Sequence, residues 1–292
     1  MTAAPVGAGS PSGGDSGLPR LLSIAGSDSS GGAGIQADLK TFAAHGGYGM
    51  SAITAITAQN TLGVTAVLAL PPAIVAAQID AVFADPGVDA VKIGMLADSG
   101  IVAAVSGSLR AASSRGRLPI VLDPVMIAKS GDALLDEAAI DELARLFPLA
   151  TLITPNLPEA ERLDGHEAPT PAARELLLRR LGERSAAVLL KGGHAGDDEV
   201  VDLLWDGARV HRFVHPRLAS RSTHGTGCTL SSAIAARLGR GEALAEAVSG
   251  AIDWLHEAIA RAIPIGAGVG PVDHFWRQRS GRQPGGAEGC LA

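Results

Sequence analysis

Residues 223–231 read Thr223-His224-Gly225-Thr226-Gly227-Cys228-Thr229-Leu230-Ser231, and a helix-forming run follows without interruption over 232–238. Two glycines spaced two apart let the backbone approach a ligand closely. A loop that feeds a helix N-terminus presents unpaired N–H groups and the positive end of the helix dipole to an anion. The stretch therefore predicts a phosphate-handling loop, with a thiol in the first helical turn, where the pKa of a cysteine tends to fall.

Short apolar runs alternate with helical stretches along the rest of the chain. We expect strands at 21–25, 51–58, 64–70, 88–93, 119–122, 151–153 and 186–190, and a hairpin of strands at 200–205 and 209–214. We expect helices at 34–45, 71–83, 98–114, 136–147, 158–163, 171–183 and 242–262. This alternation predicts an α/β fold built of right-handed βαβ units on a largely parallel sheet.

The composition supports this fold class and narrows the possible partners. Apolar residues make up 47% of the chain and aromatic residues 3%, which suits strands buried on both faces. The net charge of −6, without a basic patch or an aromatic ladder, argues against nucleic acid. The two cysteines, one of them in a Gly-rich tail, indicate a cytoplasmic protein without a structural disulfide. No apolar run approaches the roughly 20 residues of a membrane span.

One folded domain is expected, because the chain has no internal repeat and no second composition regime. Residues 1–19 are rich in Gly, Ser, Pro and Ala and lack the features of a signal peptide, so they predict a disordered arm. The domain covers 20–280, and 281–292 form a flexible tail.

Polar residues and glycines follow the predicted strands where each one ends. They are Gly26, Gln59-Asn60, Gly94-Met95, Asp123, Asn156 and Lys191. Any one of them is typical of a turn or a cap. In an open α/β sheet, however, ligands bind beyond the carboxyl ends of the strands. Taken together with the anion loop, the set indicates a functional site.

Several of these side chains keep two interpretations. Asn156 and Glu159 can face one Mg²⁺ through water, or they can cap a short helix, and both can be true at once. Lys191 can reach a phosphate as a point charge, or it can extend from a strand end into solvent. Asp38 can bind a polar substrate from the inner face of its helix, or it can be a solvated charge on the outer face.

Cys228 has three interpretations. It can be an inert buried side chain, a nucleophile with His224 as its base, or a general base that also belongs to the anion hole. The loop suits phosphate better than acyl transfer, which favours the third interpretation. The GGAG turn at 31–34 matches neither dinucleotide-binding nor P-loop patterns.

Eight segments in this order carry a family resemblance. They are 25–41 (AGSDSSGGAGIQADLKT), 58–61 (AQNT), 92–96 (KIGML), 122–126 (LDPVM), 128–131 (AKSG), 153–160 (ITPNLPEA), 190–194 (LKGGH) and 223–229 (THGTGCT). Together they resemble the hydroxymethylpyrimidine/phosphomethylpyrimidine kinases of thiamine biosynthesis, which belong to the ribokinase superfamily. The likeness spans about 21–275.

The resemblance implies a ribokinase-like αβα sandwich with a small β-hairpin element, and a kinase domain over 20–280. It implies two successive ATP-dependent phosphorylations, first of 4-amino-5-hydroxymethyl-2-methylpyrimidine and then of its monophosphate. ATP is the co-substrate, Mg²⁺ the metal, and a homodimer the expected assembly.

The resemblance also implies roles for individual residues. The pyrimidine is held by Asp38 and Gln59 and lined by Gly26, Met95 and Val125. A Gln amide offers a donor and an acceptor, which suits a ring nitrogen beside an amino group. The ATP phosphates are served by Lys191, Thr226, Asn156 and Asp123, and Mg²⁺ by Glu159 and Asn156. The anion hole and catalytic group are Gly225, Gly227 and Cys228.

Where most of the superfamily carries an aspartate base, this sequence has Cys228, as is typical of this branch and of related pyridoxal kinases. Ser27 and Ser29 are mild departures, and Met50 and Thr57 leave fine substrate preference open. The alternatives are a pyridoxal, pyridoxine or pyridoxamine kinase, a non-catalytic pyrimidine-binding protein, and a cysteine hydrolase. Because an alcohol must lose a proton and a phosphate monoester need not, we expect only the first phosphorylation to need Cys228.

Overall fold

A nine-stranded sheet organises the computed structural model, which describes residues 17–114, 116, 118–126, 139–193 and 198–280. The strands are β1 (Arg20–Asp28), β2 (Tyr48–Asn60), β3 (Gly63–Ala69), β4 (Ala90–Ile93), β5 (Ile120–Leu122), β6 (Leu152–Ile153), β7 (Val188–Leu190), β8 (Glu199–Trp205) and β9 (Val210–Pro216). The helices are α1 (Gly34–Ala44), α2 (Pro72–Ala84), α3 (Ser99–Ser113), α4 (Ala139–Leu143), α5 (Leu157–Asp164), α6 (Pro171–Gly182), α7 (Thr226–Gly239), α8 (Leu244–Ala260) and α9 (Trp276–Ser280).

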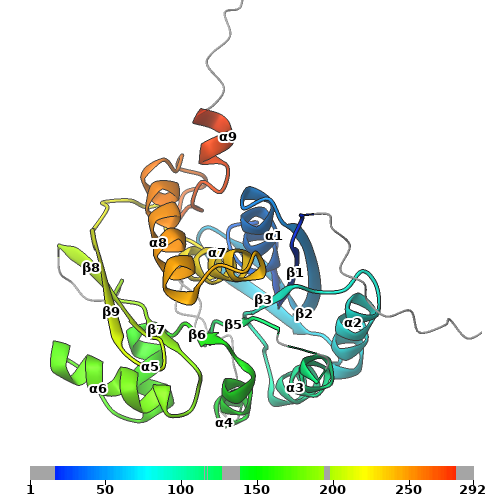
Figure 1. The fold of residues 1–292 in the computed structure, drawn as a ribbon. Helices are drawn as coiled ribbons and strands as arrows, with labels where there is room; N and C mark the ends of the chain where they lie inside the picture. The colour runs from blue at the N-terminus through cyan, green and yellow to red at the C-terminus, as the bar shows by residue number, and fades with distance from the viewer. Residues whose placement is uncertain (1–16, 115, 117, 127–138, 194–197, 281–292) are drawn as a thin grey trace, which may run out of the picture.

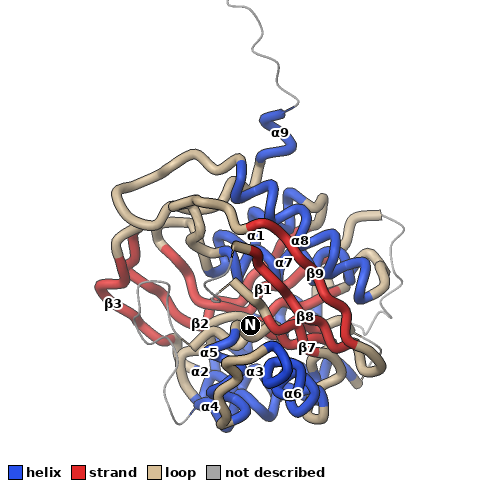
Figure 2. The backbone as a smooth tube through the Cα atoms, turned by 90° about the vertical axis from the view of Figure 1, so that its left-hand side faces the viewer, coloured by secondary structure: helices blue, strands red, loops and turns tan. Residues whose placement is uncertain are grey.

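The sheet has the order β3-β2-β1-β4-β5-β6-β7-β8-β9. The central strands, β2-β1-β4-β5-β6-β7, pair in parallel. At the two ends of the sheet, β3 pairs antiparallel with β2, β8 with β7, and β9 with β8. Figure 2 shows β3 at one side of the twisted sheet and the β8–β9 hairpin at the other. The parallel strands therefore direct all their carboxyl ends to one edge, where ligands bind in such folds.

Helices cover both faces of the sheet and bury two separate apolar cores. Helices α2 to α6 enclose one core, in which Leu22 and Ile24 of β1 pack with Ile79 and Val105. Helices α1, α7 and α8 enclose the other, in which Leu21 packs with residues such as Phe42 (Figure 1). Successive residues of β1 thus point into opposite cores, as expected for a parallel strand buried on both faces.

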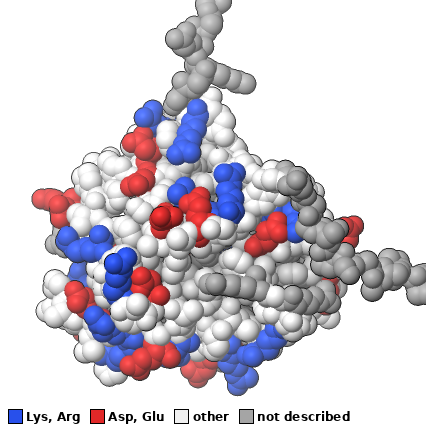
Figure 3. All heavy atoms as spheres, viewed as in Figure 1, with Lys and Arg blue, Asp and Glu red and all other residues white. Residues whose placement is uncertain are grey.

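Surface charges of both signs are interspersed on the face drawn in Figure 3. Buried charges, by contrast, gather near the carboxyl ends of the strands. A fully buried ion pair joins Lys92 of β4 to Asp38 of α1, with 2.9 Å between Nζ and Oδ2 and both side chains at 0% exposure. The hydroxyls of Ser23 and Ser232 also donate to the Asp38 carboxylate, at 2.6 and 2.7 Å. This network ties β1, β4, α1 and α7 together.

Replacing Lys92 with methionine is expected to lower the free energy of unfolding by about 3–5 kcal/mol, because the Asp38 carboxylate would stay buried without its counter-charge. Chemical denaturation measures this loss. The matched control is the half-exposed pair of Arg261 and Glu257, where Glu257→Gln is expected to cost less than about 0.5 kcal/mol. A loss for Lys92→Met as small as that of the control would contradict the prediction.

The predicted fold class is confirmed, and the differences are local. The helix expected at 136–147 is α4 followed by a 3-10 helix at Ala144–Leu149, which contains Pro148. Proline cannot continue the α-helical hydrogen bonds, which accounts for the tighter turn. The strand expected at 51–58 extends over Tyr48–Asn60, and α9 was not expected.

Some predictions lie outside the described residues. They concern most of the 1–19 arm, the AKSG segment at 128–131, and the tail at 281–292 with its Cys290. Within the described part of the chain, no helix combines the length and apolar character that crossing a membrane requires.

Candidate active site

A cavity of about 870 Å³ lies at the carboxyl ends of the parallel strands. It brings together every residue with a predicted role except Asp38, whereas Asn60 and Gly94 of the strand-end set do not line it. Its lining includes Gly26, Gln59, Met95, Asp123, Val125, Asn156, Glu159, Lys191, Gly225, Thr226, Gly227 and Cys228. Residues from several strand ends and the start of α7 thus share one space, as the strand-end pattern indicates.

The anion loop passes directly into α7. Gly225 is the N-cap of this helix and adopts a left-handed conformation with φ of 74°. A Cβ atom at this position would lie 1.9 Å from the carbonyl oxygen of Gly32, so only glycine fits against the β1–α1 loop. Because Gly225 has no side chain with which to cap, the first N–H groups of α7 are available to an anion.

Lys191 and Asp123 lie beside the second glycine of the loop. The Nζ of Lys191 is 2.7 Å from Oδ1 of Asp123, which also accepts a hydrogen bond from Thr154. A Cβ atom on Gly227 would be 3.3 Å from that ammonium and 3.4 Å from Oδ2 of Asp123. Burial lowers the pKa of Lys191, but Asp123 and Glu159 outweigh it and raise the pKa. The anion loop therefore has a fixed positive charge next to it.

Cys228 lies at the start of α7 and also accepts from the backbone N–H of Gly34, where α1 begins. The prediction that the pKa of Cys228 falls is wrong. Burial raises the pKa of the thiol to about 11, although Lys92 and the Gly34 N–H act in the opposite direction. The loss of water around the sulfur thus outweighs the Lys92 charge and the Gly34 N–H.

Asn156 and Glu159 form the capping box that was one of their two interpretations. The Asn156 side chain accepts from the Glu159 N–H at 2.9 Å, and the Glu159 carboxylate accepts from the Asn156 N–H at 2.8 Å. Burial raises the pKa of Glu159 to about 7; Lys191 opposes this shift and Asp123 adds to it. The negative charges of Glu159 and Asp123 therefore repel each other in a poorly solvated part of the site.

The other end of the cavity is lined by Gly26, Gln59, Met95 and Val125. A Cβ atom on Gly26 would lie 3.0 Å from the sulfur of Met95, so the glycine leaves room for this thioether. The register of β1 against β2 shifts between Ala25 and Ser27, and that of β2 against β3 shifts between Ala58 and Gln59. Such irregularities turn side chains away from the regular alternation, here beside the cavity.

Asp38 does not line the cavity, which corrects its predicted role in substrate binding. Its carboxylate is fully buried with Lys92, Ser23 and Ser232, and it is not among the cavity-lining residues. The sequence left open whether Asp38 lies on the inner or the outer face of α1, and it could not show that Lys92, 54 positions further on, is its partner.

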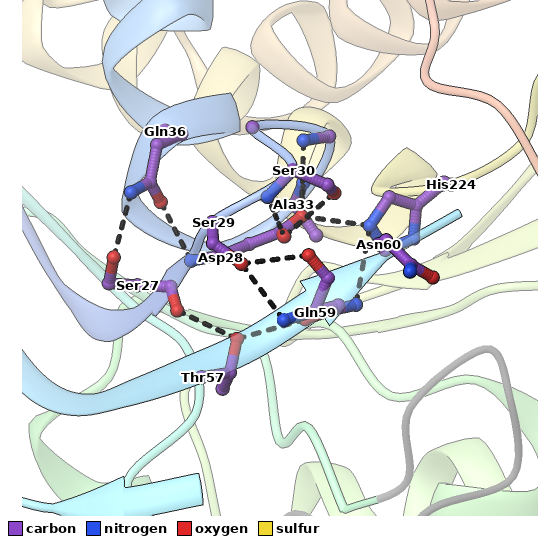
Figure 4. A network of polar contacts seen from close by, with 12 residues as sticks. Ser27, Asp28, Ser29, Ser30, Ala33, Gln36, Thr57, Gln59, Asn60 and His224 are labelled. Atoms are coloured by element: carbon purple, nitrogen blue, oxygen red, sulfur yellow. Dashed lines mark hydrogen bonds and ion pairs between the residues drawn. The ribbon is translucent and has the colours of Figure 1, made fainter. Parts of the chain in front are cut away.

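Two functional candidates were not assigned correctly from the sequence. Asp28 accepts hydrogen bonds from Ser30, Gly32 and Ala33 in its own loop. It also accepts from Nε2 of His224 at 2.9 Å (Figure 4). His224 thus joins the anion loop to Asp28 at the end of β1. The Asp-Ser-Ser-Gly-Gly run is typical of a turn closed by its Asp side chain, a signal that could have identified Asp28.

A further part of the cavity is lined from β9 and α8. The rings of His215 and His256 lie 5.3 Å apart there, beside Ile252 and Leu255. Asp202 of β8 accepts from the Gly192 N–H at 2.7 Å, and burial raises the pKa of this carboxyl group. The sequence could not identify this region, because its residues come from elements about 40 positions apart that meet only in the folded chain.

A ribokinase-like αβα sandwich, with an uncapped helix N-terminus and a partly buried lysine beside one cavity, defines a small-molecule kinase. Residues 28–273 match the family model described as phosphomethylpyrimidine kinase. The chain belongs to that family, and the resemblance found in the sequence is confirmed.

Named relatives agree with this assignment. A hydroxymethylpyrimidine/phosphomethylpyrimidine kinase of Rhizobium meliloti is 52% identical over 264 residues, which cover 88% of this chain and 97% of the relative. A thiamine biosynthesis bifunctional protein, ThiED, of Geobacter sulfurreducens is 52% identical over 87% of this chain, but this chain spans only 52% of that longer protein.

Solved structures share the fold. The phosphomethylpyrimidine kinase of Clostridium difficile superposes with a TM-score of 0.73 at 44% identity, covering 82% of this chain and 99% of that one. The pyridoxal kinase of Staphylococcus aureus in complex with AMP-PCP and pyridoxal has a TM-score of 0.81 at 32% identity, covering 90% and 95%.

Proposed function

We propose that this protein uses ATP to phosphorylate 4-amino-5-hydroxymethyl-2-methylpyrimidine and then its monophosphate, giving the diphosphate used in thiamine assembly. The observation that carries the proposal is the single cavity in which Gln59, Met95 and Val125 face the same space as Lys191 and the anion loop. The identity to relatives named as kinases of this pyrimidine and its phosphate supports the substrate class.

The cavity suggests how the two substrates are placed. The pyrimidine lies at the Gln59 end, and the nucleotide lies along β9 and α8, where His215 and His256 flank its base. The AMP-PCP complex of the related pyridoxal kinase supports ATP as the co-substrate. The transferred phosphoryl group then lies over the start of α7, where N–H groups and the Lys191 ammonium oppose its negative charge.

The side chains near the phosphates fit a Mg²⁺ ion. Among the described residues, no group of three or more His, Cys, Asp or Glu side chains is arranged around a cation. Mg²⁺ needs fewer protein ligands, because it keeps waters and phosphate oxygens in its shell. Glu159 and Asn156 would hold it as predicted, with Asp123 beside them, since burial and the Asp123 charge raise the pKa of Glu159 more than Lys191 lowers it. When bound, the ion neutralises charge on the nucleotide phosphates.

Cys228 removes the proton of the substrate hydroxyl in the first reaction. Gln59 orients the pyrimidine, and the walls of the cavity exclude water from the transferred group. In the second reaction the attacking oxygen belongs to a phosphate that is already ionised. Gln59 and the cavity walls therefore act as before, but no base is needed.

The homodimer remains part of this proposal. β3 is the last strand at one end of the described sheet, and it exposes Val67 and Leu68 beside Ile56 of β2. A strand edge with exposed apolar side chains favours pairing with a second copy. A monomer mass in light scattering would contradict it.

A panel of substrates with product masses tests the proposed function. The expected products from the hydroxymethyl pyrimidine and ATP are the monophosphate and then the diphosphate. Pyridoxal, pyridoxine and pyridoxamine belong in the same panel, because pyridoxal kinases share the fold at 32% identity. Turnover of a vitamer but not of the pyrimidine would favour the pyridoxal-kinase alternative, and binding without turnover would favour a non-catalytic protein.

A further inference from the structure

The ends of β1 and β2 and the anion loop meet in one hydrogen-bonded cluster at the pyrimidine end of the cavity (Figure 4). The end of β1 contributes Asp28, the end of β2 contributes Thr57 and Gln59, and the anion loop contributes His224. The Ser29 hydroxyl exchanges hydrogen bonds with the backbone of Gln59, donating to its carbonyl oxygen at 2.7 Å and accepting from its N–H at 2.9 Å. The cluster therefore holds the backbone of Gln59 in place and leaves its side-chain amide to be oriented by neighbours.

The proton on His224 is determined by Asp28. An ionised carboxylate can only accept hydrogen bonds. Burial raises the pKa of Asp28, but hydrogen bonds from His224, Ser30 and Ala33 outweigh it and lower the pKa to about 2. Because Nε2 of His224 lies 2.9 Å from Oδ2 of this carboxylate, Nε2 must carry a proton and donate it.

The same nitrogen of His224 lies 3.4 Å from Nε2 of the Gln59 amide, so two N–H donors would face each other in this orientation. An Nε2 that donates cannot accept from an amide N–H, so the amide oxygen is the atom that suits this position. The opposite atom of the amide then lies 3.2 Å from the Thr57 hydroxyl. That hydroxyl can accept from an amide N–H, because its own proton goes to the Ser27 carbonyl oxygen at 2.9 Å. With its oxygen toward His224, the amide shares the N–H that Asp28 accepts and places its own N–H against the Thr57 hydroxyl, whereas the opposite orientation would set two N–H donors face to face.

We propose that His224 is a specificity-determining positioning residue, which fixes the Gln59 amide with its oxygen toward the imidazole. This inference rests on the proposed function. With the amide so fixed, Gln59 offers the substrate one N–H and one oxygen lone pair in a defined order. That order selects between ligands that present an acceptor beside a donor and ligands that present the reverse.

Two pyrimidines that differ at one position present these opposite orders. In the 4-amino substrate an unprotonated ring nitrogen, an acceptor, lies beside an amino group, a donor. In the 4-oxo analogue with the same hydroxymethyl and methyl groups, a ring N–H lies beside a carbonyl oxygen. A fixed Gln59 amide pairs with both groups of the 4-amino substrate. Against the 4-oxo analogue it would face a donor with its N–H and an acceptor with its oxygen, and such unpaired polar groups let a hydrogen-bonding site reject a ligand strongly.

The test compares kcat/KM for the 4-amino substrate and the 4-oxo analogue in the full-length enzyme. His224→Phe keeps a ring of similar size against Gly32 but removes the N–H, so the amide can rotate. We expect the preference for the 4-amino substrate to fall by about tenfold or more. The rotated amide can pair with either pyrimidine, so roughly one to two hydrogen bonds no longer distinguish the two substrates. The KM for ATP is expected to stay unchanged.

The matched variant is His224→Gln, whose terminal N–H reaches about as far as Nε2 and is expected to retain the preference. Equal losses for both pyrimidines in His224→Phe, or a higher KM for ATP, would overturn the inference in favour of a merely structural role. A His224→Gln variant that loses the preference as fully as His224→Phe would overturn it as well. Failure of wild-type enzyme to phosphorylate the 4-amino substrate would instead contradict the proposed function.

A measurement on the wild-type protein covers the case in which His224→Phe does not fold. The imidazole ¹⁵N resonances of a ¹⁵N-histidine sample report which ring nitrogen is protonated, and the resonances missing from His224→Gln identify His224 among the eight histidines. We expect Nε2 of His224 to be protonated at neutral pH. An unprotonated Nε2 would overturn the inference.

Discussion

Replacing Cys228 with alanine is expected to slow phosphorylation of the hydroxymethyl pyrimidine by about 10²–10⁴-fold, the usual contribution of a general base. Phosphorylation of the monophosphate is expected to change much less. The first reaction must remove a proton from an alcohol, whereas a phosphate monoester has a second pKa of about 6 and is ionised near neutral pH. The two reactions share one cavity but differ in their need for a base.

The surroundings of Cys228 make this difference measurable as a pH dependence. Because the pKa of the thiol is raised to about 11, the neutral thiol predominates at neutral pH. A base acts only in its deprotonated form, so kcat/KM for the first reaction is expected to rise with pH through the range below that pKa. The second reaction should lack this alkaline rise.

Each reaction is measured separately, with the pyrimidine and with its monophosphate as the starting substrate. Cys228→Asp is the informative companion variant, since a carboxylate has a much lower intrinsic pKa and shifts the rise toward lower pH. Cys228→Ser keeps the volume but not the acidity, and is expected to resemble alanine. Equal losses of both reactions in Cys228→Ala would show that the thiol only completes the anion hole.

The sequence predicted the architecture well because its signals are local. Buried parallel strands are short apolar runs, and the glycine at 225 is required by close backbone approach and a left-handed turn. The strand-end residues followed from the same logic, since parallel strands bring their carboxyl ends to one edge. Most of the candidate site could therefore be predicted from residue types and their spacing alone.

The errors concern charges whose partners are distant in the chain. Asp38 and Lys92 are 54 positions apart, and Asp28 and His224 are 196 apart. Pattern and spacing show which face of an element a side chain takes, but not which charge meets it there. The predicted fall of the Cys228 pKa is wrong for a related reason. Its pKa depends on burial and on Lys92, Asp38 and Gly34, which lie far from it in the chain.

Replacing Lys191 with methionine is expected to slow both phosphorylations by about 10²–10³-fold, a loss typical of removing one group that stabilises charge in the transition state. Lys191 lies beside Gly227 and Asp123, where the transferred phosphoryl group is expected in either reaction. That group and its charge are the same in both reactions, so the ratio of the two rates should not change. This is the opposite of the Cys228→Ala result.

Separate assays of the two reactions measure that ratio, and thermal unfolding of each variant shows how much of the loss is structural. Methionine keeps most of the side-chain volume, but it leaves Asp123 buried without its counter-charge. The double variant Lys191→Met with Asp123→Asn removes the unpaired carboxylate and is expected to recover stability. Because Asp123 also belongs to the proposed phosphate and Mg²⁺ site, its activity is compared with that of Asp123→Asn alone and is expected to stay well below it. A variant that loses only the first reaction would place Lys191 beside the hydroxyl nucleophile. Recovery of activity together with stability would show that the lysine acts through the fold and not through the phosphoryl group.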